Sequence, residues 1–425
     1  MAKLKRSLNF TEVTLTGVGI ILGAGIYALI GQGVALTGNS VWLALLFGGI
    51  IAMFTGMSYA ELSSMFPEAG AEYEYASEAF GKRLALALAL LIVIGAGISG
   101  SVVALGFGGY LSHFVNIPMQ LSALLLIVAS TGVLLYGVKE SAWLGIIFTI
   151  IEALGLFIII AIGIPHLGGV DYFEMPHGLT GLLSATALMF FAFVGFGDIC
   201  KLSEETKKAK KIIPIATISA IAISTLLYVL VGLAVISILP WQELASSDAP
   251  VAVVAQHVLG SKGGTTLAMI ALFSTSNTLL LFLLATSRLM YGVAEKIKKI
   301  SKLAWVHPRF RTPWYAILFV STVSAVFIFA GSIREVAFIG NFSIFVTYIV
   351  VNAANIYIRV KMPKIKRGFR AGPSFHRLPV ISVLGLLSSV FLLLNLSKDA
   401  IIYGSAITLL SLALSYLLVK PSAKK

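Results

Sequence analysis

A single carboxylate stands in the middle of a long apolar segment. Glu152 lies halfway along the run from Trp143 to Gly163, and no lysine or arginine is near it in the sequence. An ionised carboxylate at the centre of a bilayer costs on the order of 3 kcal/mol on insertion scales, so such residues face a protein interior. This one can hold either a proton or a cation, or it stays protonated and hydrogen-bonds a neighbouring helix. Glu61, by contrast, falls near the end of an apolar segment, where water is close.

Two pairs of glycines interrupt apolar runs elsewhere in the chain. Gly23 and Gly25 lie in the middle of residues 10–36, and Gly195 and Gly197 lie near the middle of the sixth apolar segment. Each glycine weakens a helix by roughly 1 kcal/mol relative to alanine. Backbone groups freed inside a bilayer must be buried in protein or line a cavity. A half-helix that starts there offers N–H donors and a positive dipole end to an anion.

The spacing of the first pair also fits close packing between helices. Gly19 and Gly23 form a G-x-x-x-G pattern, which lets two helix backbones approach one another. A broken helix and a packing face are both open for this segment taken alone. The second glycine pair, at the corresponding place of the sixth segment, favours the broken helix.

Five consecutive polar residues stand in the eighth apolar segment, from Ser274 through Thr275 to Thr278. We consider Ser274 and Thr275 candidates to ligate a coupling ion through their hydroxyl oxygens. The alternative is that the whole run joins neighbouring helices.

The sequence predicts no cofactor, no metal site and no catalytic residues. All six histidines fall in loops or at the ends of predicted spans, and Cys200 is the single cysteine. No pair of histidines or cysteines has metal-ligand spacing. These features argue against an enzyme embedded in the membrane.

The composition is that of an integral membrane protein. Of 425 residues, 58% are hydrophobic and 12% are charged, whereas soluble domains carry about 25% charged residues. Continuous apolar runs of about 20 residues predict transmembrane helices rather than a barrel. We expect twelve spans, at approximately residues 10–37, 41–64, 84–112, 120–137, 142–163, 179–200, 214–238, 264–291, 313–330, 336–358, 377–396 and 400–419.

The basic residues predict the orientation of these spans. With twelve spans, 28 of the 31 lysines and arginines fall on one side, and the other side receives Lys262, Arg334 and Lys398. This asymmetry predicts a cell-membrane protein with both termini in the cytoplasm. The net charge of +13 is therefore a topology signal and needs no nucleic acid as a partner. Anionic lipid headgroups are the expected neighbours of residues 361–370.

We expect the chain to form one transmembrane domain, residues 1–425, with an internal repeat. Spans one and six, which carry the glycine pairs, begin two five-helix halves at residues 10–163 and 179–358, and two further helices follow at 377–419. Glycine-interrupted segments at corresponding positions of two halves indicate an inverted-repeat transporter with a site near the membrane midplane.

In four segments, the sequence resembles permeases of the amino acid–polyamine–organocation (APC) superfamily. The order and spacing of the segments carry the resemblance, together with the loop Pro240–Gly260. The segments are Gly17–Tyr27, similar to the first-helix signature G-x-G-I-[FY]; Ser58–Pro67 with Gly70, Tyr73, Tyr75 and Ala79–Gly81; Phe190–Phe196 with Glu204–Thr206 and Ile213–Pro214; and Ser287–Tyr291 with Thr312–Pro313.

The resemblance implies a leucine-transporter-type fold, which is all-α, with a 5+5 inverted repeat and discontinuous helices 1 and 6. It implies that backbone N–H groups of span one receive a substrate carboxylate and that backbone carbonyls of span six receive an α-amine. The implied substrate-binding residues are Ile21, Gly23, Ala24, Gly25, Phe191, Ala192, Val194 and Gly195, with Phe193 and Phe196 as walls of the pocket.

Three positions depart from the family pattern. The family's double glycine after the second span is Gly70-Ala71 here, which we expect to have little effect. Similar proton-coupled members carry a lysine in span five, 13 residues after a loop lysine, and the same count from Lys139 reaches Glu152. A glutamate there could carry the proton itself, ligate a metal cation or pair with a cationic substrate. An acidic residue that several members place directly after the Gly-Phe pair of span six is shifted by one position, to Asp198.

The sequence therefore predicts a secondary active transporter, an importer of amino acids by alternating access that is coupled to protons or another cation through Glu152. Alternatives in the same class are an amino acid or amine exchanger and a polyamine or organocation transporter. Alternatives from other classes are a permease-like sensor that does not transport and an intramembrane enzyme. The expected partners are a small-molecule substrate, an ion and membrane lipids. Which residues of spans three, eight and ten face the substrate stays open, as does the oligomeric state.

Overall fold

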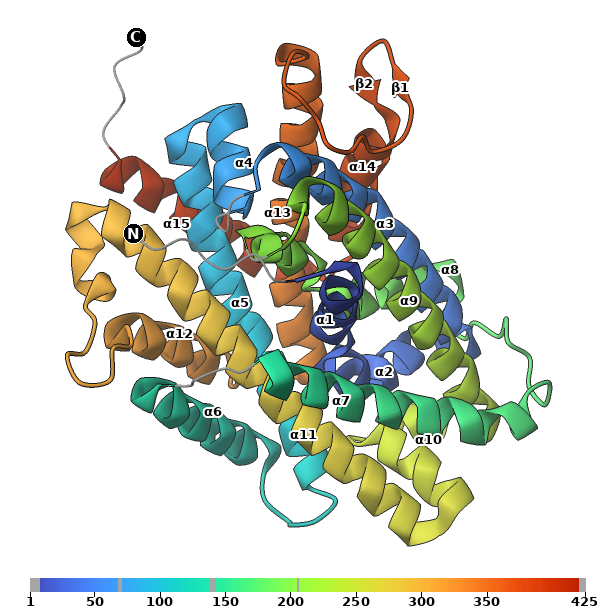
Figure 1. Ribbon diagram of the computed structural model, residues 1–425. Coiled ribbons are helices and arrows are strands. Elements are labelled where there is room, and N and C mark those ends of the chain that lie inside the picture. Colours follow the sequence, from blue (N-terminus) through green and yellow to red (C-terminus); the bar gives the residue numbers. More distant parts are fainter. Residues whose placement is uncertain (1–7, 68–70, 138–141, 205, 420–425) are drawn as a thin grey trace.

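The computed structural model describes residues 8–67, 71–137, 142–204 and 206–419, and these are built almost entirely from helices (Figure 1). Gly70, Lys139 and Glu205, which were named from the sequence, lie outside the described residues. A short antiparallel pair of strands, β1 (Ser374–Phe375) and β2 (Leu378–Pro379), joins two of the last helices.

Fifteen α-helices and five 3-10 helices make up the described chain. The α-helices are α1 (Phe10–Leu22), α2 (Ala24–Thr37), α3 (Val41–Met65), α4 (Ala71–Phe80), α5 (Lys82–Leu111), α6 (Met119–Tyr136), α7 (Ala142–Gly163), α8 (Gly178–Met189), α9 (Ala209–Ile238), α10 (Trp241–Ser246), α11 (Pro250–Lys296), α12 (Trp314–Phe327), α13 (Ile333–Lys361), α14 (Val380–Leu394) and α15 (Lys398–Leu418). The 3-10 helices are η1 (Gly38–Ser40), η2 (Ile164–His166), η3 (Phe190–Phe193), η4 (Phe196–Glu204) and η5 (Lys298–Ala304).

In the part of the chain that the structure describes, nine helical segments are long and apolar enough to cross a membrane. Three shorter apolar helices, α1, α12 and α14, accompany them. The chain is therefore a multi-pass membrane protein. Each of the twelve predicted ranges overlaps at least one of these helices, and the range 377–396 also takes in β2 ahead of α14.

One predicted loop is helical. The segment Pro240–Gly260 forms α10 and the beginning of α11, and Gly260 bends α11 with a φ of 71°. Pro240 caps α10 and Pro250 is the first residue of α11. A proline at these positions loses no helical hydrogen bond, so proline begins these helices rather than preventing them.

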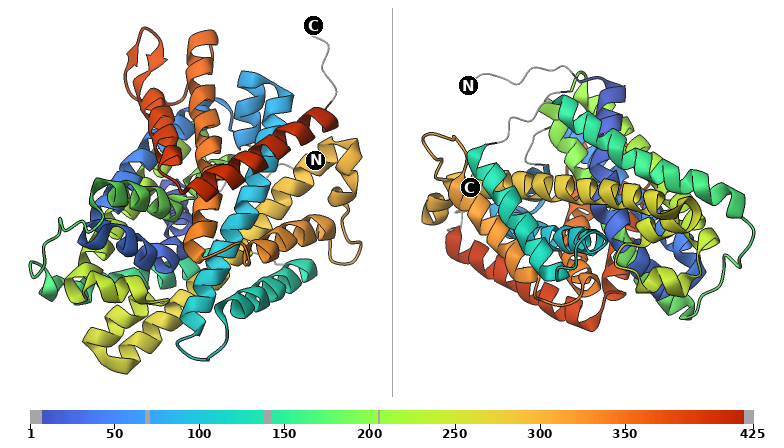
Figure 2. Two further views of the ribbon diagram at one scale, coloured as in Figure 1. Left: turned by 180° about the vertical axis from the view of Figure 1, so that it is seen from behind. Right: turned by 90° about the horizontal axis from the view of Figure 1, so that it is seen from below.

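The helices form two packed groups with α2 and α8 between them. In one group, the long buried helix α5 contacts α11, α13, α6 and α12 (Figure 1), and α15 lies across its outer side (Figure 2). In the other group, α9 contacts α3, α1 and α7. The helix α2 touches both groups because it contacts α5 and α11 as well as α8 and α3.

Both predicted helix breaks are present. The first apolar run is helical to Leu22, bends at Gly23 with φ −23° and ψ −160°, and is helical again from Ala24. In the sixth run, α8 tightens into η3, Val194 is extended with ψ 138°, and Gly195 has a φ of +112°. Glycine adopts this φ without the steric penalty that a side chain would meet. The prediction of a break in each run is confirmed.

The glycines of the first run also serve as packing faces. A Cβ added at Gly19 would lie 1.9 Å from Thr149 Oγ1 of α7, and one added at Gly23 would lie 2.8 Å from Thr278 Oγ1 of α11. The broken helix and the close packing, which the sequence left as alternatives, therefore occur together in α1 and α2.

The two breaks touch each other. A Cβ at Gly25 would lie 2.7 Å from the Cα atom of Ala192 in η3. A Cβ at Gly195 would lie 3.1 Å from the carbonyl oxygen of Ile20. The backbones of two segments about 170 residues apart meet here because one residue of each contact is a glycine, which has no side chain to hold the segments apart.

Replacing Gly25 with alanine is expected to lower the melting temperature of the detergent-solubilised protein, because the added methyl group meets backbone that has no room to move. Overpacking of this kind costs about 1–3 kcal/mol. The matched control is Gly292→Ala on α11, where a Cβ meets nothing within 4 Å and alanine is the better helix former. Equal melting temperatures for the two variants would show that the close approach at Gly25 is not required.

Candidate functional site

One tyrosine holds the two breaks together. The hydroxyl of Tyr228, a buried residue of α9, lies 2.6 Å from the carbonyl oxygen of Ile21 and 2.9 Å from that of Ala192. Both carbonyls have lost helical partners near the breaks, and unsatisfied carbonyls inside a membrane cost several kcal/mol. The shared O–H of Tyr228 therefore satisfies opened backbone of both segments at one point.

The start of α2 is capped from α11. The backbone N–H of Ala24 donates to Thr278 Oγ1 over 3.0 Å. This N–H is one of the groups that the resemblance assigned to a substrate carboxylate. The carbonyls of Ala192 and Phe191 likewise accept hydrogen bonds within the protein, from Tyr228 and from the N–H of Val194 at 3.2 Å. A ligand that binds these backbone groups must displace the hydrogen-bond partners that the protein supplies to them.

A cavity of about 120 Å³ lies beside the second break. Most of its lining is apolar, and its walls come from α5, α11 and α13 together with the break itself. The lining residues are Tyr59, Glu72, Ile92, Gly95, Ala96, Ser99, Val194, Gly195, Gly197, Asp198, Phe282, Ala285, Thr286, Leu289, Ser343, Ile344, Thr347 and Tyr348. Val194 and Gly195 are the predicted site residues that line this cavity. Gly23 and Ala24 contact Thr278 instead, and Gly25 contacts Ala192.

The cavity wall carries hydroxyl groups from several helices, among them α5 and α13. Ser99 Oγ donates to the carbonyl oxygen of Gly95 within α5, and Thr347 Oγ1 donates to that of Ser343 within α13. Ser343 Oγ is buried and makes no hydrogen bond in the described structure. This serine therefore has both a donor and an acceptor to offer at the wall.

The two predicted aromatic walls pack beside the cavity and do not line it in the described structure. Phe193 meets the ring of Tyr228 edge-on at 5.2 Å. Phe196 packs against Tyr59 at 5.7 Å and Tyr348 at 5.1 Å, and these two tyrosines are cavity residues. Phe193 and Phe196 thus support the wall from behind.

Glu152 lies on α7 with 2% of its surface exposed and is not among the residues that line the cavity. Asn277 Nδ2 of α11 donates to its Oε1 over a long 3.4 Å, and Ser274 lies near the same carboxylate, although Ser274 Oγ makes no hydrogen bond in the described structure. Among the described residues, no ion pair involves Glu152. Thr275 Oγ1 instead donates to the carbonyls of its own helix at Ala271 and Leu272. Of the three predicted coupling-ion residues, Glu152 and Ser274 lie close together, whereas Thr275 bonds its own helix.

Glu152 is also connected to the broken helix through its backbone. The hydroxyl of Tyr27, three residues into α2, donates to the carbonyl oxygen of Glu152 over 2.7 Å. Tyr110 of α5 in turn donates to the carbonyl oxygen of Tyr27 over 2.9 Å. A rotation of α2 therefore changes the surroundings of Glu152 directly.

The sequence interpretation missed Tyr228, Tyr27 and the hydroxyl groups of α5 and α13. Tyrosines inside apolar spans were a signal, because a buried tyrosine hydroxyl needs a partner. Their partners are backbone carbonyls of distant segments, which no periodicity identifies.

Interrupted helices that meet beside a cavity inside an apolar bundle are typical of membrane transporters. A family model described as amino acid permease matches residues 8–409, and the chain belongs to this family. This agrees with the APC resemblance.

Several characterised relatives are similar along most of the chain. The branched-chain amino acid permease BcaP of Bacillus subtilis (strain 168) is 28% identical, over 99% of this chain and 94% of the relative. The methylthioribose transporter of the same organism is 29% identical, over 89% and 86%. The inner membrane transport protein YbaT of Escherichia coli (strain K12) is 30% identical, over 71% and 73%.

Removing the hydroxyl of Tyr228 is expected to destabilise the protein by about 1–3 kcal/mol, because Tyr228→Phe leaves two buried carbonyls without this donor. Thermal denaturation in detergent measures the loss. The control is Tyr403→Phe, which removes the same group from an exposed tyrosine of α15. A Tyr228 variant as stable as its control would contradict a bridging role.

Proposed function

We propose that this permease is a secondary active transporter that imports amino acids by alternating access, with its substrate site at the two helix breaks. The observation that carries the proposal is the direct contact between the breaks, next to a cavity with hydroxyl groups on its wall. The start of α2 supplies N–H groups at a positive dipole end for a carboxylate. The break in span six supplies backbone carbonyls for the amine of the substrate.

We further propose the membrane arrangement that this mechanism needs. Twelve spans form two inverted five-helix repeats, residues 10–163 and 179–358, with two additional helices at 377–419. Both termini lie on the cytoplasmic side of the cell membrane, as the distribution of lysine and arginine favours. Glu72 of α4 and Asp198 of η4 line the cavity at its cytoplasmic end in this arrangement.

Aliphatic amino acids are the first substrates to test. The largely apolar cavity wall supports them, and BcaP, a relative over nearly the whole chain, is named as a branched-chain amino acid permease. Amines or cationic amino acids are the second candidate, because two carboxylates line the same cavity. A relative from Arabidopsis thaliana that is 27% identical over 79% of this chain is named cationic amino acid transporter 4.

In the proposed cycle, Glu152 carries the coupling ion. Coupling requires that its affinity for the ion differ between the two facing states. Tyr27 provides the mechanical connection, because it belongs to α2 and bonds the Glu152 backbone. Ser274 and Asn277 supply oxygen and amide groups beside the carboxylate.

Transport is tested in proteoliposomes that contain unlabelled amino acids, by following entry of a labelled amino acid mixture. Entry that an inward proton gradient strengthens supports the symporter. Entry that ignores the gradient and needs internal amino acids supports an exchanger. Absence of entry under both conditions would overturn the amino acid proposal and direct the assay to polyamines and other organic cations.

Glu152→Gln is expected to abolish gradient-driven accumulation while exchange of labelled for unlabelled substrate continues, because the amide cannot bind and release a proton. The control is Glu243→Gln, the same change at an exposed residue of α10. If the Glu152 variant accumulates substrate as well as the wild type does, Glu152 is not the coupling group.

A further inference from the structure

Polar side chains of α3, α13 and α14 face one another over part of these helices. Thr55, Ser58 and Glu61 recur every three residues on α3, and residues three or four apart share one helix face. Asn352, Asn355 and Arg359 form the matching face of α13, and Ser382 adds a hydroxyl from α14. All seven are buried. We call these seven residues the polar ladder.

Hydrogen bonds connect the part of the ladder that lies away from the C-terminus of α13. Ser58 Oγ lies 2.6 Å from Asn352 Oδ1 and 2.9 Å from Ser382 Oγ. Asn352 Nδ2 donates to Thr55 Oγ1 over 3.0 Å, and Asn355 Nδ2 donates to Ser382 Oγ over 2.9 Å. Each helix is thus bonded to the others at a defined height and a defined rotation.

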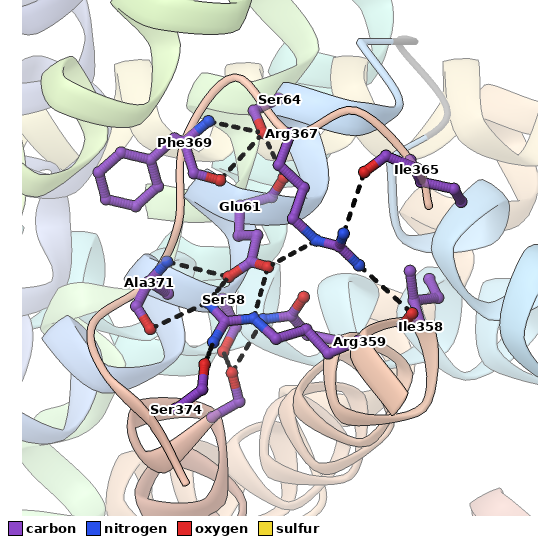
Figure 3. A network of polar contacts seen from close by, with 12 residues as sticks. Ser58, Glu61, Ser64, Ile358, Arg359, Ile365, Arg367, Phe369, Ala371 and Ser374 are labelled. Carbon is purple, nitrogen blue, oxygen red and sulfur yellow. Dashed lines mark hydrogen bonds and ion pairs between the residues drawn. The ribbon is translucent and has the colours of Figure 1, made fainter. Parts of the chain in front are cut away.

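An ionic cluster closes the ladder at the end near the C-terminus of α13 (Figure 3). Arg359 donates to both carboxylate oxygens of Glu61, from Nε to Oε1 over 2.7 Å and from its terminal nitrogen to Oε2. Arg367 Nε lies 3.2 Å from Oε1, and the N–H of Ala371 donates to Oε2 over 2.9 Å. Glu61 is fully buried, so the expectation that it lies close to water was wrong. The loop after α13 folds back and covers it.

The cluster holds one carboxylate and two guanidinium groups. The second positive charge lies at the end of α13, where Arg367 donates to the carbonyl oxygens of Ile358 at 3.4 Å and Met362 at 3.3 Å. The C-terminal end of a helix carries a partial negative charge and unpaired carbonyls, which a cation stabilises. The loop is therefore attached both to α3 and to the helix that it leaves.

Stability alone is a weak reason for such a cluster. Replacing buried ion pairs by apolar residues of similar volume is often neutral or stabilising, and the best-attested use of buried polar groups is to specify register. Specification is needed here because apolar helix faces in lipid do not distinguish one rotation from another.

The helix that the ladder orients also forms the cavity wall. Ser343, Ile344, Thr347 and Tyr348 of α13 line the cavity, within three turns of Asn352. Asn352 also donates to the carbonyl oxygen of Tyr348 over 2.9 Å, so the two parts of the helix adjoin. A shift of one residue would turn these side chains by about 100°.

We propose that the polar ladder is a positioning device that fixes the rotation of α13 and thereby aims Ser343, Thr347 and Tyr348 at the substrate cavity. Its positioning residues are Glu61 and Arg359, together with Arg367, which adjoins the ladder through its contact with Glu61. The proposal rests on the proposed function, in which this cavity receives the substrate.

The decisive variant replaces the whole ionic cluster, Glu61→Leu with Arg359→Met and Arg367→Met. No charge is left unpaired, so the melting temperature is expected to stay close to that of the wild type. The KM for transport is expected to rise about tenfold, with a smaller change in maximal rate, because Ser343, Thr347 and Tyr348 are no longer held in the orientation that binds substrate. An unchanged KM would overturn the proposal.

A labelling experiment tests the rotation without transport. In a Cys200→Ala background, Thr347→Cys on the cavity face is compared with Val346→Cys on the neighbouring face for reaction with a water-soluble maleimide. Thr347→Cys is expected to react faster when the ladder is intact, and the difference is expected to shrink in the triple variant. The same ratio with and without the cluster would refute the positioning role, whether or not the protein transports amino acids.

Two further variants complete the test. Arg370→Gln removes an exposed arginine from the same loop, and it is expected to leave both KM and the labelling ratio unchanged. If the triple variant does not fold, Arg359→Lys serves in its place, because it keeps the charge and loses the two-pronged contact with Glu61. It is expected to shift the labelling ratio in the same direction, and an unshifted ratio would contradict the proposal.

Discussion

The absence of water inside a bilayer is the constraint on which this structure depends. A helix can be broken there only where other parts of the protein supply hydrogen-bond partners. At the first break, Thr278 receives the N–H of Ala24, and at the contact of the breaks Tyr228 bonds the carbonyls of Ile21 and Ala192. The two breaks are thus stabilised by hydrogen bonds from α9 and α11 as well as by contacts between the interrupted helices themselves. No segment could form its break alone.

Glu61 and Glu152 are both buried, but their different surroundings suit them to different roles. Glu61 meets two guanidinium groups and a backbone N–H, so protonating it would leave buried positive charges without a counter-charge. Glu152 meets an amide at long distance, a serine and no ion pair among the described residues. The first environment suits a permanent structural charge. The second suits a group whose occupancy changes, which is why the coupling proposal is placed there.

The two glutamates also connect the proposed site to opposite groups of helices. Glu152 lies on α7 and reaches the broken helix through Tyr27, whereas Glu61 belongs to the polar ladder that orients α13. An alternating-access cycle needs one part that changes and one that keeps its geometry. In our proposals, the contact of Tyr27 with α7 belongs to the changing part, and the polar ladder belongs to the constant part.

The sequence by itself determined the membrane class, the positions of the helices and both interruptions, because hydropathy and glycine act locally along the chain. It also placed Glu152 in a buried position and indicated the permease family. Only the tertiary structure decided which groups meet. It showed that Glu61 is buried under a returning loop, that Thr275 bonds its own helix, and that Ser343 and Thr347 line the cavity. In helices that are apolar on every side, periodicity carries no record of which face points inward, so packing between distant segments makes that choice.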